Sequence, residues 1–140
     1  MSPVTKVEPR ILDEIDRGFD AQIAFLQGLV RCPSVRGAEH TVHDYVFDAL
    51  AKRGYAMDRW RVCEDDIKDH PGFSPVAVSY ENTWVVVGTH RPNTATGRSL
   101  IMNAHIDVVP PGPTDMWTFP PYNPVIRDGW MYGRGAADMK

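Results

Sequence analysis

The sequence predicts an α/β fold in which helices cover a sheet in layers. Two stretches with helical spacing of apolar residues come first, and several strand-like apolar runs follow them. Two of these runs, residues 83–89 and 99–104, are apolar on both faces, which is typical of strands buried in the middle of a sheet. Such a sheet needs helices on both sides, and the 140 residues supply only two. We therefore expect an incomplete part of a layered α/β/α domain.

The first helix is expected from residue 11 to about residue 31. Its apolar residues are three or four positions apart and so lie on one face, and Pro33 ends the helix. These apolar residues are Ile11, Ile15, Phe19, Ile23, Leu26 and Val30. Residues 1–10 hold two prolines and no periodicity, so we interpret them as a flexible arm in front of a single unit, residues 11–140.

The second helix is expected from about residue 38 to residue 53, with Gly54 at the position of a C-terminal cap. Its apolar stripe consists of Val42, Tyr45, Val46, Ala49 and Leu50. His40, His43 and Asp44 lie on the same helix, but their spacing is not that of an HExxH metal site. We interpret these three residues as a solvated helix face.

Strands joined by loops are predicted after the two helices. One strand is expected at residues 55–62 and another at residues 83–89, where β-branched and aromatic residues predominate. Between them, residues 64–82 carry acids, prolines and glycine, and are expected to form an ordered surface loop. A further buried strand is expected at residues 99–104.

A proline-rich segment and a hairpin are expected near the end of the chain. The aromatic residues Trp117, Phe119 and Tyr122 follow several prolines, and they are equally consistent with the wall of a cleft and with a cap over the end of the sheet. Residues 125–132 predict a hairpin, because apolar residues flank the pair Asp128-Gly129, which favours a type I′ turn.

Composition excludes several classes of function. The net charge is −3 and no basic patch stands out, so nucleic acid is not expected as a partner. The sequence has neither a signal-peptide core nor an apolar run that could span a membrane, so the cytoplasm is the expected location. Cys32 and Cys63 form no CxxC pair, and both are expected to be buried, reduced thiols.

Two groups of metal-binding side chains stand out in residues 99–140. His105 and Asp107 are two residues apart at the end of a predicted strand, so they can share a face at the edge where ligands bind in open α/β sheets. Asp138 follows the glycine-flanked turn of residues 133–135. A neutral imidazole suits zinc, cobalt or manganese. The carboxylate of Asp107 could be a second ligand, or could hold the histidine in place from behind.

In combination, these motifs resemble the peptidase M20 family of metallohydrolases. That family includes the acetylornithine deacetylase and succinyl-diaminopimelate desuccinylase group, the aminoacylases and the carboxypeptidase G-type enzymes. The residues that carry the resemblance are 105–110, Trp117 and 128–140. Residues 29–35 followed by Glu39, and residues 70–76, look like further stretches of the family.

The resemblance implies a fold, a cofactor and residue roles. The fold would be the N-terminal part of an α/β/α catalytic domain of the zinc-peptidase type. The cofactor would be two divalent metal ions, zinc in the first place, with cobalt or manganese as alternatives. His105 would bind one metal and Asp138 would bridge both, while Asp107 would be the catalytic residue that orients and polarises the site. The peptide bond after Asp138 would be cis.

The activity implied is hydrolysis of the amide bond of N-acylated amino acids or small peptides by a metal-activated water. In relatives, a Glu-Glu pair that includes the general base, the remaining ligands and a lid or dimerisation domain lie further downstream. No residue of this sequence corresponds to them. We therefore expect a fragment that is inactive alone, from a full-length protein that forms a homodimer. The alternative is a non-catalytic remnant or interaction module of the same fold.

Overall fold

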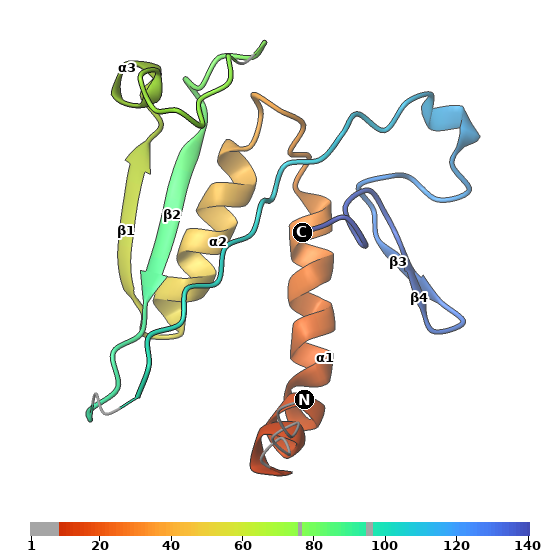
Figure 1. The fold of residues 1–140 in the computed structure, drawn as a ribbon. Coiled ribbons are helices and arrows are strands. Elements are labelled where there is room, and N and C mark those ends of the chain that lie inside the picture. Colours follow the sequence, from red (N-terminus) through yellow and green to blue (C-terminus); the bar gives the residue numbers. More distant parts are fainter. Residues whose placement is uncertain (1–8, 76, 95–96) are drawn as a thin grey trace, which may run out of the picture.

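The structure, a computed structural model, describes residues 9–75, 77–94 and 97–140 (Figure 1). Residues 1–8 of the expected arm lie outside the described residues. In chain order the elements are helix α1 (Pro9–Arg31), helix α2 (His40–Lys52), strand β1 (Ala56–Arg61), helix α3 (Glu64–Ile67), strand β2 (Trp84–Thr89), the 3₁₀ helix η1 (Thr114–Met116), strand β3 (Val125–Arg127) and strand β4 (Trp130–Tyr132). The described part is thus a mixture of helices and small antiparallel sheets.

Helix α1 confirms the predicted helix and begins two residues before the expected start. It ends at Arg31, before Pro33, as the sequence predicts. Its buried residues are Leu29 and Val30 near the carboxyl end, whereas apolar side chains near its start, such as Phe19, are exposed. The helix therefore anchors the molecule through its last turns.

Helix α2 packs against both α1 and the first sheet. The rings of Phe25 and Tyr45 stack with their centroids 5.5 Å apart, and a side chain at Gly28 would collide with Tyr45, so this glycine permits the close contact. The helix ends as predicted, because Gly54 takes a φ of 81° and its N–H donates to the Ala51 carbonyl.

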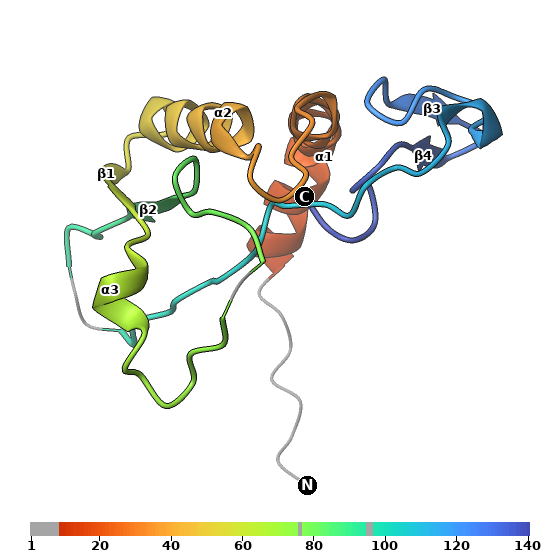
Figure 2. The ribbon, with the colours of Figure 1, turned by 90° about the horizontal axis from the view of Figure 1, so that it is seen from above.

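The first sheet has two antiparallel strands, β1 and β2, with α2 on one face (Figure 2). Its register pairs Ala56 with Thr89 and Arg61 with Trp84. The views agree that this sheet and α2 lie on one side of α1, and the β3–β4 hairpin on the other (Figures 1 and 2). The layered zinc-peptidase domain stays a prediction, since the described residues place a helix on one face of a two-stranded sheet.

The predicted buried strand at residues 99–104 is wrong. Those residues have no strand partner, and the side chains of Leu100, Ile101 and Met102 are 81%, 90% and 87% exposed. A strand exists only through backbone hydrogen bonds to a neighbour, and among the described residues β2 pairs with β1 alone. The apolar pattern is real, but nothing described lies beside it.

Two other expectations change in detail. The expected surface loop of residues 64–82 opens with the short helix α3, which has acids in its first turn and the Lys68–Asp65 ion pair at 2.7 Å. The predicted hairpin is confirmed: Asp128 and Gly129 have φ values of 53° and 79°, the positive angles that a type I′ turn requires at both positions.

The core lies where the end of α1, the start of α2 and residues 106–108 meet. Its buried apolar residues are Leu29, Val30, Val42 and Val108, and its buried polar residues are Ser34, Glu39 and His43. His43 is only 6% exposed, which corrects the solvated face expected for it, because its ring turns inward beside Val42. None of the described helices is both long enough and apolar enough to cross a membrane.

Candidate metal centre

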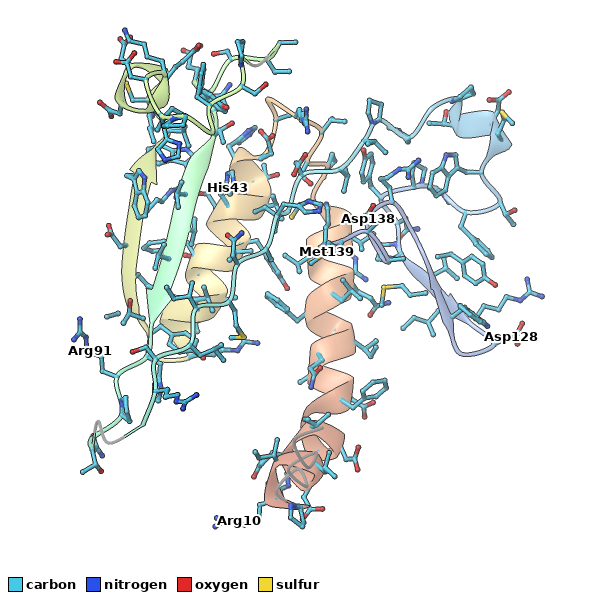
Figure 3. All side chains as sticks on the ribbon, in the orientation of Figure 1. Arg10, His43, Arg91, Asp128, Asp138 and Met139 are labelled. Atoms are coloured by element: carbon cyan, nitrogen blue, oxygen red, sulfur yellow. The ribbon has the colours of Figure 1, made fainter. Side chains whose placement is uncertain are left out.

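The structure brings the three predicted site residues together. His105 Nδ1 lies 3.1 Å from Asp107 Oδ1, and His105 Nε2 lies 3.7 Å from Asp138 Oδ1. Figure 3 shows Asp138 beside the carboxyl end of α1, whereas Asp128 lies at the far tip of the hairpin. Residues 33 positions apart in the sequence therefore meet at the surface around one imidazole ring.

The contacts of His105 suit a metal ligand. Nδ1 lies 3.1 Å from the Asp107 carboxylate and 3.3 Å from the Asp107 backbone carbonyl, two acceptors that favour a proton on this nitrogen. In that tautomer Nε2 carries a lone pair and lies 3.7 Å from the Asp138 carboxylate. Two acceptors this close repel each other, and a proton or a metal cation between them would remove the repulsion. A gap of 3.7 Å is within reach of one ion that binds nitrogen and oxygen at roughly 2.0–2.2 Å each. This donor pair fits a divalent metal.

Within the described residues, the possible metal ligands of this site are His105 and Asp138. No group of three or more His, Cys, Asp and Glu side chains in this part of the chain is arranged to hold an ion. Asp107 faces the opposite nitrogen of the ring from Asp138, so it acts behind His105 and not beside it. Of the two roles left open for Asp107, the geometry favours the orienting one.

The segment with His105 and Asp107 is attached to the exit of α1. The Ser34 hydroxyl donates to the Ile106 carbonyl at 2.7 Å, and the Val108 N–H donates to the Ser34 carbonyl at 2.9 Å. Val35 and Val108 form an isolated parallel bridge. A single bridge thus takes the place of the strand that was expected to present these residues.

Arg36 contacts the same carboxylate from outside. Its Nε lies 3.4 Å from Asp107 Oδ2, so one oxygen of Asp107 faces the histidine and the other faces a guanidinium. The Arg36 side chain is 76% exposed, and such pairs contribute about 0–1 kcal/mol. The sequence reasoning missed this contact, since no local pattern links positions 71 residues apart.

The loop with Asp138 is fastened to α1 by Lys140. Its ammonium group donates to the Leu29 carbonyl at 2.9 Å and to the Cys32 carbonyl, at the negative end of the helix dipole. Burial lowers the pKa of Lys140 below its ordinary value, and the proximity of Cys32 opposes this. Sequence reasoning missed this lysine; its only signal was its position two residues after Asp138.

Glycines let this loop close on the core. Gly135 has a φ of 88°, and a Cβ there would lie 2.8 Å from Val108 Cγ1. A Cβ at Gly133 would lie 2.6 Å from Val30 Cγ1. A side chain at either position would push the loop outward. The peptide bond after Asp138 is trans, since none of the described bonds is cis, which differs from the bond implied by the resemblance.

Trp117 and Phe119, two of the three aromatic residues after the proline-rich segment, line an open hollow of about 510 Å³. Trp117 Nε1–H donates to the Pro111 carbonyl at 2.9 Å, and the Arg134 guanidinium lies 5.0 Å from the Trp117 ring centroid. Phe119 and Tyr132 complete the wall. Trp117 and Phe119 thus form part of a cleft wall, whereas Tyr122 and the three site residues do not line this hollow.

The cysteines are free, as predicted, but their burial differs from expectation. Cys32 is half-buried and its thiol donates to the Gly28 carbonyl at 3.6 Å. Cys63 is exposed just before α3. His70 is a plain loop residue whose ring accepts the Gly72 N–H at 3.0 Å.

Comparisons with known proteins find similarity over most of this chain. Residues 101–140, which include all three site residues, match the model of peptidase family M20/M25/M40. Succinyl-diaminopimelate desuccinylase of Methylorubrum extorquens is 36% identical over 119 residues, 84% of this chain and 26% of that protein. The enzyme of the same name from Methylobacterium radiotolerans is 36% identical over 121 residues, 86% of this chain and 26% of that protein.

A shorter match with a higher identity covers part of the chain. Succinyl-diaminopimelate desuccinylase of Xanthomonas euvesicatoria pv. vesicatoria is 52% identical over 60 residues, 43% of this chain and 14% of that protein. The chain spans about a quarter of the length of the curated relatives that it matches most widely. With the family model and these relatives in agreement, the chain belongs to peptidase family M20/M25/M40.

Proposed function

We propose that the chain supplies part of the active site of a metal-dependent amidohydrolase. The reaction is hydrolysis of the amide bond of an N-acylated amino acid or small peptide. The observation that carries the proposal is the position of the His105 ring, with Asp107 on one nitrogen and Asp138 facing the other. The names of the relatives support an N-succinyl amino acid as the substrate class.

In this proposal His105 and Asp138 would hold divalent metal, with Asp138 as the ligand that two ions would share; zinc is expected in the first place, with cobalt or manganese as alternatives. When bound, such ions supply an activated water and polarise the acyl carbonyl. Asp107 keeps the proton on Nδ1, so that Nε2 stays free to bind and the ring keeps its orientation. The Asp138 side chain is 94% exposed, so its oxygens are open to ions and substrate from solvent.

The number of ligands sets the expected strength of the site. A catalytic zinc generally has three protein ligands and a water, and the described residues gather two ligands. The 140-residue protein is therefore expected to bind zinc weakly and not to turn over substrate. Hydrolysis of N-acyl amino acids by the purified protein with added zinc or cobalt would contradict this part of the proposal.

A zinc titration of the purified protein tests the site. We expect His105→Ala and Asp138→Ala to abolish the binding that the unaltered protein shows, because each removes one of two ligands. Asp107→Ala should weaken binding about 10- to 100-fold, as for other partners that act behind a ligand. Asp69→Ala, which removes an exposed loop carboxylate, is the matched control. Unchanged affinity in His105→Ala would refute the proposed centre, and unchanged affinity in Asp107→Ala would remove Asp107 from it.

A further inference from the structure

Ser34 holds the chain on both sides of Asp107. Its hydroxyl donates to the carbonyl of Ile106 at 2.7 Å, and its own carbonyl accepts the N–H of Val108 at 2.9 Å. The residue is fully buried, with 0% of its surface exposed. A buried hydroxyl that satisfies a backbone carbonyl fixes both groups, since either one left alone loses a hydrogen bond without regaining one from water.

Apart from the burial of Val108, the other contacts of this segment among the described residues are weak. Residues 99–104, just before it, have no strand partner, and the His105 side chain is 52% exposed. Arg36 reaches Asp107 at 3.4 Å, but it does so from solvent, where an ion pair contributes little. The buried hydrogen bonds of Ser34, together with the packing of Val108 in the core, are therefore the main restraints on the position of His105 and Asp107.

The same stretch of chain also contacts the loop with Asp138. Lys140 donates to the carbonyls of Leu29 and Cys32, which lie within five residues of Ser34. Gly135 packs closely against Val108, whose N–H bonds to Ser34. Residues 29–34, at the end of α1 and just beyond it, thus contact both segments that meet at the His105 ring. Both contacts join residues that are more than 70 positions apart in the sequence.

We propose that Ser34 is a positioning residue of the metal centre, which holds His105 and Asp107 in register with Asp138. The role assigned to it rests on the proposed function, because the metal is what the positioned residues would bind. The hydrogen bond itself and its effect on the histidine ring do not depend on any metal.

The first experiment is made on the metal-free protein. The tautomer of His105 is measured from the nitrogen shifts of ¹⁵N-histidine above neutral pH, and His105→Gln assigns its signals among the five histidines. In the unaltered protein, the Nδ1–H form should predominate because Asp107 accepts that proton. In Ser34→Ala, we expect a shift toward the Nε2–H form that a free imidazole prefers. A merely structural role would lower the midpoint of thermal unfolding and leave the tautomer unchanged.

The second experiment is a zinc titration of the same variant. Loss of one buried hydrogen bond predicts affinity weaker by roughly 3- to 10-fold. Ser79→Ala is the matched control, because Ser79 is exposed and its hydroxyl only accepts the Glu81 N–H, at 3.1 Å. If Ser34→Ala does not fold by circular dichroism, Ser34→Cys, which keeps the size and a weak donor, undergoes the same two measurements.

The outcomes separate the two proposals. A changed tautomer with weaker zinc binding supports the role of Ser34. An unchanged His105 tautomer in a folded Ser34 variant overturns it, whatever the zinc titration shows. If even the unaltered protein binds no zinc, the proposed function fails, while the tautomer still decides whether Ser34 positions His105.

Discussion

At the scale of single residues, His43 and His105 differ in burial and in the contacts of their rings. His43 is 6% exposed and its Nδ1 has no hydrogen-bond partner among the described residues, whereas His105 is half exposed and has a carboxylate near each nitrogen. The sequence places His43 in a polar run with His40 and Asp44, and it gives no sign that this ring turns inward. Because the ring is buried, the stability of the protein should depend on pH through His43.

Burial lowers the pKa of His43 below its ordinary value of 6.5. Glu39 and Asp44 oppose this shift, and Arg59 and His40 add to it. Below 6.5, the unfolded chain binds a proton at this site that the folded chain resists, so stability falls until the folded pKa is passed. We expect His43→Gln to have a shallower loss of unfolding free energy between about pH 7 and pH 5.

Urea unfolding at a series of pH values measures this slope. The control is His70→Gln, which makes the same replacement at an exposed loop histidine. Equal slopes for His43→Gln and the unaltered protein would show that His43 does not contribute to the pH dependence.

At the scale of elements, local signals in the sequence were sufficient for some features. Pro33 and Gly54 mark the ends of α1 and α2, and Asp128-Gly129 marks the hairpin turn, because each acts through the backbone angles of its own neighbourhood. The contact between His105 and Asp107 is also a local feature, since a single residue separates them in the sequence.

Other features depend on contacts that no local pattern records. The Ser34–Ile106 bond joins residues 72 positions apart, and the Lys140–Leu29 bond joins residues 111 apart. The apolar run at residues 99–104 has the composition of a strand. A strand also needs a hydrogen-bonded partner, and composition does not show whether a partner is present. Local patterns in the sequence could therefore propose candidate site residues, but they could not predict the distant contacts that hold those residues.

The attachment of Lys140 to α1 has a measurable effect. Lys140→Met keeps the length of the side chain and removes both hydrogen bonds to the Leu29 and Cys32 carbonyls. Charge-assisted bonds of this kind contribute about 1.5–3 kcal/mol, so unfolding free energy should fall by about that amount. Lys68→Met is the control, because Lys68 is 51% exposed and its ion pair with Asp65 should contribute under about 1 kcal/mol.

Chemical denaturation without added metal measures both lysine variants. Equal stabilities of Lys140→Met and Lys68→Met would show that the buried ammonium group does not fasten the loop with Asp138.

At the scale of the whole molecule, burial is concentrated and apolar surface is widely exposed. The core lies around the end of α1, while Ile11, Leu12, Ile15 and Phe19 at its start are 46–56% exposed. Ile101, the most exposed of the large apolar residues in the described chain, belongs to the unpaired run at residues 99–104. The β1–β2 sheet offers two edges that no described strand covers. Exposed apolar runs and open sheet edges favour association between chains.

We therefore expect the purified protein to self-associate through residues 99–104. Sedimentation should give an apparent mass above the 15.7 kDa of one chain, and the mass should rise with protein concentration. Ile101→Lys places a charge in the middle of the apolar run and should shift the protein toward the monomer, since edge lysines oppose strand pairing. Asn93→Lys adds the same charge at an exposed turn outside the run and should leave the association unchanged. Equal association of the two lysine variants would place the contact elsewhere, and a monomeric unaltered protein at all concentrations would show that this exposed surface does not drive association.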